Sequence, residues 1–274
     1  MLTRILTSIV AVMVLLPVLF LSDTIVFPIA IAIVTVIGLW EMFNCIGLKN
    51  KYAMTAPSFI AGAALPFAVK YTNLAGSGLF SSLIVIYALY LFAAAVFGHK
   101  SVSVTDAAMA FISSVYVIGG FVCIQLLREL SDSIYLLAFI GAWITDIFAY
   151  FSGRFFGKHK LCEAVSPKKT IEGSIGGILF CAISFVVFAM ITNGLGMSVE
   201  HYAVWALVGV VISVVSQIGD LSMSLIKRHY EIKDFGKIFP GHGGILDRFD
   251  SVIAVSFVLY IILAALTNLN VIIF

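Results

Sequence analysis

Long apolar runs are the feature that most restricts what this chain can fold into. Nine stretches come close to the roughly 20 residues that a helix needs to cross a bilayer. Only helices and closed β-barrels satisfy their backbone hydrogen bonds in lipid, and these runs lack the alternation of barrel strands. We therefore expect an all-α integral membrane protein, a polytopic bundle of about nine transmembrane helices. The expected spans are residues 4–22, 24–44, 54–71, 79–97, 107–127, 134–153, 173–193, 202–226 and 250–269.

The first run also has the features of a secretory signal peptide, because Arg4 precedes an apolar stretch. A signal peptide ends in a small-residue cleavage site, whereas Leu21, Ser22 and Asp23 follow this run. We therefore expect the run to persist as a helix of the folded protein.

Positive charges are distributed unevenly over the two sides that nine spans would create. Of the 16 lysines and arginines, 14 fall on the side of the N-terminus, and only Lys70 and Arg128 fall on the other. Because cytoplasmic loops are enriched in Lys and Arg, we expect the N-terminus and the two long polar loops to lie in the cytoplasm. The expected location is the cell membrane, inner or plasma, with multiple passes.

Two acids inside expected spans point to a polar surface at a common depth. Asp146 lies about seven residues before the sixth span ends and Asp220 about six before the eighth ends, or roughly 10 Å below both helix ends. Asp220, Ser224, Lys227 and Arg228 share one helix face, since their spacing is i, i+4, i+7, i+8. Ionisable groups in spans usually face a cavity or a partner. The alternatives are hydrogen-bonded packing for the acids and simple snorkelling for the two cations.

A glycine-rich turn leads into the last expected span. Glycines allow close backbone approach to a ligand, and the helix N-terminus that follows should offer free N–H groups to an anion. Asp247 and Asp250 lie one helical turn apart, and such carboxylates suit Mg²⁺ together with substrate phosphates. The alternative is that both are ordinary first-turn acids favoured by the helix dipole. The turn consists of His242, Gly243 and Gly244.

A second polar loop, residues 153–177, contributes five more cations. Its GRFFGK segment is one residue short of a Walker A loop, lacks Ser or Thr after Lys158 and follows a helix, so we reject a P-loop. The SPKKT run, residues 166–170, is a plausible clamp for phosphate, and as a plain charge cluster it would only set topology. Acids for a divalent metal, several cations and a glycine-rich helix start together indicate phosphoryl or nucleotidyl transfer, which depends on positioning and charge neutralisation. Because the polar groups open below the membrane surface, one substrate should be a lipid and the other a soluble polyphosphate; no nucleic acid partner is expected.

The run from Ser224 to Asp250 resembles the signature of the CDP-diacylglycerol synthase, or phosphatidate cytidylyltransferase, family. It reads S-x-x-K-R-x-x-x-x-K-D-x-x-x-x-x-x-P-G-H-G-G-x-x-D-R-x-D without a departure. The resemblance is strong over residues 140–255 and limited to hydropathy in the early helices. Further positions similar to the family are Asp146, Ala149, Tyr150, Gly153, Phe156, Gly157, Ser166, Pro167, Lys169, Thr170, Glu172, Gly173, Gln217, Gly219, Asp220 and Leu221.

This resemblance implies that CTP and phosphatidic acid react to give CDP-diacylglycerol and pyrophosphate. It also implies Mg²⁺, with a second metal ion left open, a homodimer, and an active site facing the cytoplasm. By the same resemblance, Asp220 and Asp247 bind the metal, with Asp146 and Asp250 assisting. The resemblance implies that phosphates are bound by Lys169, Lys227, Arg228 and Arg248. It also implies that the site is lined by Ser166, Thr170, Ser224, Lys233, His242, Gly243 and Gly244.

Three alternative functions remain beside the synthase. Two share its broad fold, namely a CTP-dependent polyprenol or phytol kinase and a CDP-archaeol synthase; the third is an ion-coupled transporter. We expect residues 1–127 to be scaffold and residues 128–274 to carry the chemistry within one continuous membrane domain. Within the site, Lys227, Arg228 and the glycine turn should hold the triphosphate, while Lys169 serves the lipid phosphate or the leaving pyrophosphate, because in-line transfer separates attacking and leaving oxygens.

Overall fold

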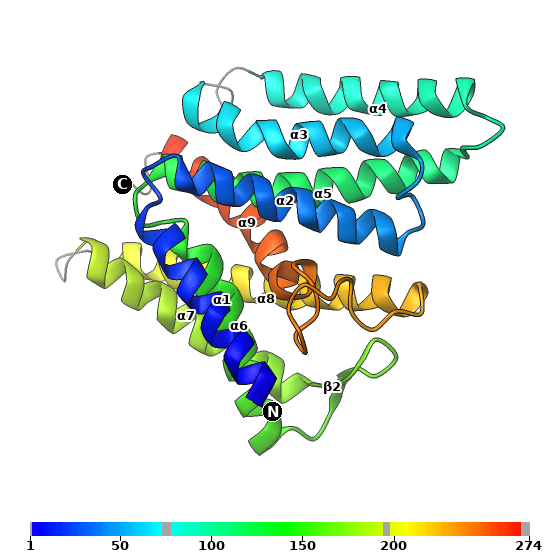
Figure 1. Cartoon of the computed structure of the whole chain (residues 1–274). Helices are drawn as coiled ribbons and strands as arrows, with labels where there is room; N and C mark the ends of the chain where they lie inside the picture. The colour runs from blue at the N-terminus through cyan, green and yellow to red at the C-terminus, as the bar shows by residue number, and fades with distance from the viewer. Residues whose placement is uncertain (1, 73–77, 194–197, 270–274) are drawn as a thin grey trace. The chain divides into compact units, whose positions relative to one another are not determined.

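The computed structural model describes residues 2–72, 78–193 and 198–269, and these are helical apart from one short hairpin (Figure 1). Each expected span coincides with a helix, with ends that differ by a few residues. The helices are α1 (Leu2–Phe20), α2 (Val26–Cys45), α3 (Tyr52–Tyr71), α4 (Leu79–Phe97), α5 (Val104–Leu130), α6 (Leu136–Phe156), α7 (Ile171–Asn193), α8 (Val199–His229) and α9 (Leu246–Asn268).

Eight of the helices in the described residues are long and apolar enough to cross a membrane. They are α2 to α9, so the expected class, a polytopic helical membrane protein, is confirmed. Within α1 a shorter apolar segment, Val10–Phe20, is recognised, and its crossing of the bilayer stays a prediction.

The chain divides into two compact units. The first comprises Met1–Asp132 and Tyr230–Phe249, and the second comprises Ser133–His229 and Asp250–Phe274. The polar segment after α8 therefore belongs with the early helices, while α6, α7, α8 and most of α9 form the other unit.

In the first unit, α2, α3 and α5 pack against one another and α4 packs on α5 (Figure 1). The core is apolar, with Leu39, Phe43 and Phe121 fully buried. The ring centroids of Phe121 and Phe249 lie 5.4 Å apart, so the first turn of α9 packs into the same core.

Ionic and polar contacts show which helix ends meet within the first unit. Lys70 donates to the backbone carbonyls of Asp23 and Thr24, and Arg128 donates to Ser22 Oγ at 2.9 Å. Both cations that the sequence assigns to the sparsely charged side thus bind the turn between α1 and α2. The sequence assigns these three segments to one side of the membrane, and that assignment stays a prediction.

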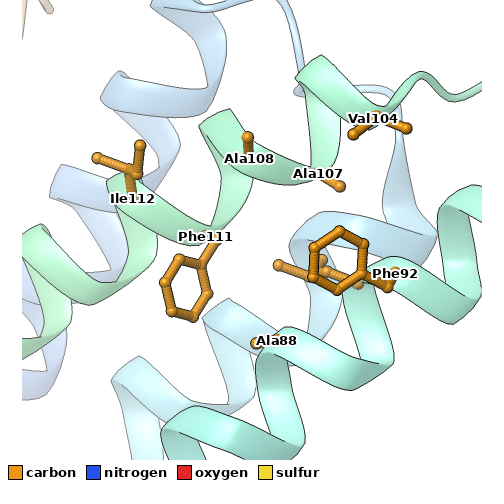
Figure 2. A pocket seen from close by; sticks show the side chains of 8 residues that line it. Ala88, Phe92, Val104, Ala107, Ala108, Phe111 and Ile112 are labelled. Carbon is orange, nitrogen blue, oxygen red and sulfur yellow. The ribbon is translucent and has the colours of Figure 1, made fainter.

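A cavity of about 280 Å³ lies between α4 and α5 in the same unit (Figure 2). Every side chain around it is apolar, so it offers neither charge nor hydrogen bonds to a phosphate. The lining residues are Ala88, Leu91, Phe92, Val104, Ala107, Ala108, Phe111 and Ile112.

In the second unit, small residues let helices approach closely. A Cβ added at Gly209 would lie 2.7 Å from the Ala182 Cα, and one at Gly219 would lie 2.6 Å from the Ala254 Cβ. These positions bring α8 against α7 and α9, as small residues commonly do in membrane proteins. The unit therefore holds its helices at distances that larger side chains would forbid.

The loop between α6 and α7 forms an antiparallel hairpin, where the sequence indicated only a charged loop. Strand β1 is Lys160–Cys162 and strand β2 is Ser166–Thr170, so the SPKKT run is a strand. Lys160 Nζ donates to the Pro167 carbonyl at 2.5 Å, which ties the two strands together through a side chain.

Candidate active site

The central contact of the second unit is an ion pair between Lys169 of β2 and Asp220 of α8. The two side chains are 23% and 25% exposed, so both are partly withdrawn from water. Two residues that the sequence placed in the site from separate segments are thus brought together.

Neighbouring residues explain why Lys169 lies at this point. Thr170 Oγ1 accepts the Gly173 N–H at 3.1 Å, which caps the start of α7 directly after the strand. A Cβ at Gly153 would lie 2.8 Å from that same hydroxyl, so glycine is needed where α6 meets the strand. Glu172 accepts the Lys158 N–H at 3.0 Å and so holds the segment before β1 at the same end of the hairpin. The residues around Lys169 therefore form its support, and Thr170 acts as a cap in this structure.

Two further carboxylates interact electrostatically with Asp220 of this ion pair. The charges of Asp146 on α6, Asp220 on α8 and Asp250 on α9 interact with one another. The positive charge of Lys169 also attracts the Asp146 carboxylate, and that of Lys227 attracts the Asp250 carboxylate. A group of acids with cations at its edge is the electrostatic pattern expected for a site that binds a metal and phosphates.

The two acids in mid-helix keep the matched depth that the sequence indicated. Asp146 lies 10 residues before the end of α6, and Asp220 lies nine before the end of α8. Both helices continue further than hydropathy suggested, so each acid is about 14 Å from its helix end. Because an ionisable group is costly in lipid, this depth indicates a water-accessible surface.

The expected polar stripe of α8 lies within one continuous helix that ends at His229. Ser224 Oγ donates to Asp220 Oδ1 at 3.5 Å, a weak bond from the side of Asp220 nearer the end of α8. Lys227 is half-buried and Arg228 is exposed. Exposure to solvent therefore increases along the stripe, from the partly buried Asp220 to the exposed Arg228.

The first unit contains the rest of the signature, organised around Asp247. Its Oδ2 accepts the N–H groups of Phe235 at 2.8 Å and Gly244 at 2.9 Å, and the residue is only 8% exposed. Gly243 has φ of +85°, and a Cβ there would lie 2.6 Å from the Asp247 Oδ2. Glycine is required here both for the turn and for the carboxylate, which closes the loop on itself.

Glu41 of α2 binds the signature segment, a contact that sequence reasoning missed. Its carboxylate is fully buried and accepts the Ile245 N–H at 3.0 Å and the Leu246 N–H at 2.9 Å. The signal was present, because Glu41 is the only charged residue in α2. The expected free N–H groups at the start of α9 are instead occupied by the carboxylates of Glu41 and Asp247. These three N–H groups are therefore not free for an anion, and phosphate binding by the glycine turn stays a prediction.

The remaining expected site residues lie in the loop after α8, in the first turn of α9 and in β2. Lys233 and Arg248 are exposed, while His242 and Ser166 are half-buried. No group of three or more His, Cys, Asp or Glu side chains in the described residues is arranged to hold a metal ion. Mg²⁺ needs only one or two carboxylates together with substrate phosphates, so the acids near Asp220 fit that ion.

Comparisons with known proteins cover nearly the whole chain. The model of the cytidylyltransferase family matches residues 2–266. A phosphatidate cytidylyltransferase from Staphylococcus aureus (strain COL) is 38% identical over 254 residues, or 90% of this chain and 93% of that protein. Proteins of the same description from S. epidermidis and S. haemolyticus are 36% and 35% identical over 259 and 253 residues, with the same coverage. The chain belongs to the cytidylyltransferase family.

Proposed function

We propose that this protein is a phosphatidate cytidylyltransferase, a membrane enzyme of phospholipid biosynthesis. A phosphatidate oxygen attacks the α-phosphorus of CTP, the bond from that phosphorus to the bridging oxygen of the β-phosphate breaks, and pyrophosphate leaves. The products are CDP-diacylglycerol and pyrophosphate. Support comes from relatives of this description along 90% of the chain, none of which is described as a transporter.

The observation that carries the proposal is the Lys169–Asp220 pair within a group of acids on spanning helices. A carboxylate and an ammonium group at this depth can meet the head group of a lipid and the phosphates of a nucleotide. The attacking phosphate is already anionic at neutral pH, so the chain need not supply a base. Its task is to orient two anions and to offset their repulsion, which Lys169, Lys227 and Arg228 are placed to do.

We assign Mg²⁺ to this site, with Asp220 as the principal carboxylate and Asp146 and Asp250 as its neighbours. When bound, the ion would neutralise charge that develops on the phosphates. Metal binding by Asp247 is implied by the family resemblance alone, whereas in the structure its Oδ2 organises the loop. A cytoplasmic orientation and a homodimer are parts of the same proposal.

One assay tests the proposal. Purified protein receives phosphatidate, labelled CTP and Mg²⁺, and both a CDP-lipid and pyrophosphate are measured. Asp220→Asn and Asp247→Asn should each lower turnover by at least about 10²-fold, the scale of losing a major electrostatic element. Asp132→Asn is the matched control, since Asp132 is 91% exposed and pairs with Arg128. Near-normal turnover of both variants, or no CDP-lipid from the unmodified protein, would refute the proposal.

A further inference from the structure

Glu41 makes contacts that a structural residue of a spanning helix does not need. Its carboxylate is fully buried in an otherwise uncharged helix, and both of its hydrogen bonds reach residues more than 200 positions away in the sequence. A buried acid in a membrane helix is costly and is usually tied to function. The partners of Glu41 belong to the polar segment that carries the family signature. A change at Glu41 should therefore alter the structure of this segment.

Each oxygen of the carboxylate binds one backbone N–H, Oε1 from Ile245 and Oε2 from Leu246. Asp247 Oδ2 takes the next N–H group back along the chain, that of Gly244. Three successive N–H groups at the start of α9 are therefore bound by two buried carboxylates. An ionised carboxylate accepts at both oxygens, a property that the amide of glutamine lacks.

The loop backbone lies in close contact with the Glu41 carboxylate. A Cβ added at Gly236 or Gly244 would overlap the Glu41 carboxylate, so the backbone of the loop passes directly over it on both sides of the turn. The same segment exposes Lys233 and includes His242 and Arg248, which the family resemblance assigns to the substrate site. Any loosening of this anchor would displace those side chains.

We infer that Glu41 is a positioning residue for the reaction, acting through the loop of residues 230–249 and the first turn of α9. It fixes Asp247 and the cationic side chains of the loop by holding the Ile245 and Leu246 N–H groups, and it touches no substrate itself. This inference rests on the proposed function for its catalytic consequence, while the anchoring of the loop is a property of the protein alone.

The test compares Glu41→Gln with Thr35→Val, a control in the same helix. Thr35 is also fully buried, and its hydroxyl bonds only within α2, to the Ile31 carbonyl. Hydrogen–deuterium exchange of the full chain in micelles should show exchange at the Ile245 and Leu246 amides at least about tenfold faster in Glu41→Gln, the scale of a lost bond to a charged group. Thr35→Val should leave these amides as they are.

Steady-state kinetics supply the second readout. Glu41→Gln should raise the KM for CTP at least about threefold as well as lowering kcat, because displaced loop cations weaken ground-state binding too. A smaller folded fraction would lower only the apparent kcat. Gly244→Ala disturbs the same contact from the loop side and should reproduce both effects if Glu41→Gln does not fold.

The outcomes separate the two proposals. Unchanged loop exchange in folded Glu41→Gln and Gly244→Ala overturns the anchoring. Faster exchange with unaltered kinetics upholds the anchoring and overturns the positioning role in the reaction. The proposed function stands in both cases. Faster exchange in a protein that makes no CDP-lipid from CTP and phosphatidate upholds the anchor and refutes the function.

Discussion

From the Lys169–Asp220 ion pair, we predict that the effect of Asp220→Asn on stability changes sign when Lys169 is also replaced. Asp220 is attracted by Lys169 and repelled by Asp146 and Asp250. Breaking a fully buried pair costs roughly 3–5 kcal/mol, and exposures of 23% and 25% reduce this to about 2 kcal/mol for Lys169→Met. That is roughly a 30-fold shift in the unfolding equilibrium.

Asp220→Asn alone removes an attraction of about 2 kcal/mol together with a repulsion of about 1 kcal/mol, so we expect it to destabilise the protein by about 1 kcal/mol. With Lys169→Met already present, only repulsion remains, and Asp220→Asn should then stabilise the protein by about 1 kcal/mol. The coupling energy from the double-mutant cycle should therefore be about 2 kcal/mol.

Unfolding can be followed by SDS titration in mixed micelles, with fluorescence from Trp143 and Trp205 of the same unit. Lys168→Met is the control, because Lys168 is an exposed cation of the same strand. Equal effects of Asp220→Asn in the two backgrounds, within about 0.5 kcal/mol, would refute this account of the acid group.

Two further predictions concern topology and substrate binding. A cysteine in place of Lys158 or Lys237, in a chain without native cysteines, should resist impermeant thiol reagents in intact cells and react after permeabilisation, whereas one at Asp132 should react at once; the reverse pattern would contradict a cytoplasmic site. Arg228→Ala should mainly raise the KM for CTP, and Lys169→Ala should alter the phosphatidate dependence or kcat, measured by varying each substrate separately. If Arg228→Ala shifts only the phosphatidate curve, the division of the phosphates is wrong.

The spans could be predicted because lipid imposes both length and apolarity on a crossing helix. Hydropathy fails at the helix ends, where charged residues lie beyond the apolar stretch and the helix still continues. In α8, Lys227 and Arg228 are helical although the apolar stretch was expected to finish at residue 226. The two acids were therefore found by their position in the sequence, but their distance from the helix ends was underestimated.

The hairpin and the role of Glu41 could not be predicted for two different reasons. The segment from Lys160 to Thr170 is short and charged, and its pairing depends on the adjoining helix ends and on the Lys160–Pro167 bond. Glu41 binds backbone N–H groups, which every non-proline residue carries, so no pattern of side chains reveals its partners. The free helix start expected before α9 failed for the same reason.

The long sequence separation of Glu41 from its partners also has a consequence for biosynthesis. Ile245 follows Glu41 by 204 residues. At about 5–20 residues per second, the ribosome needs roughly 10–40 s to make that stretch. During this interval α2 enters the bilayer while the Glu41 carboxylate lacks the backbone N–H groups that it binds in the folded protein. Completion of the N-terminal unit therefore waits for translation of the last quarter of the chain, and a nascent protein stalled before residue 245 would present an unmatched acid to membrane quality control.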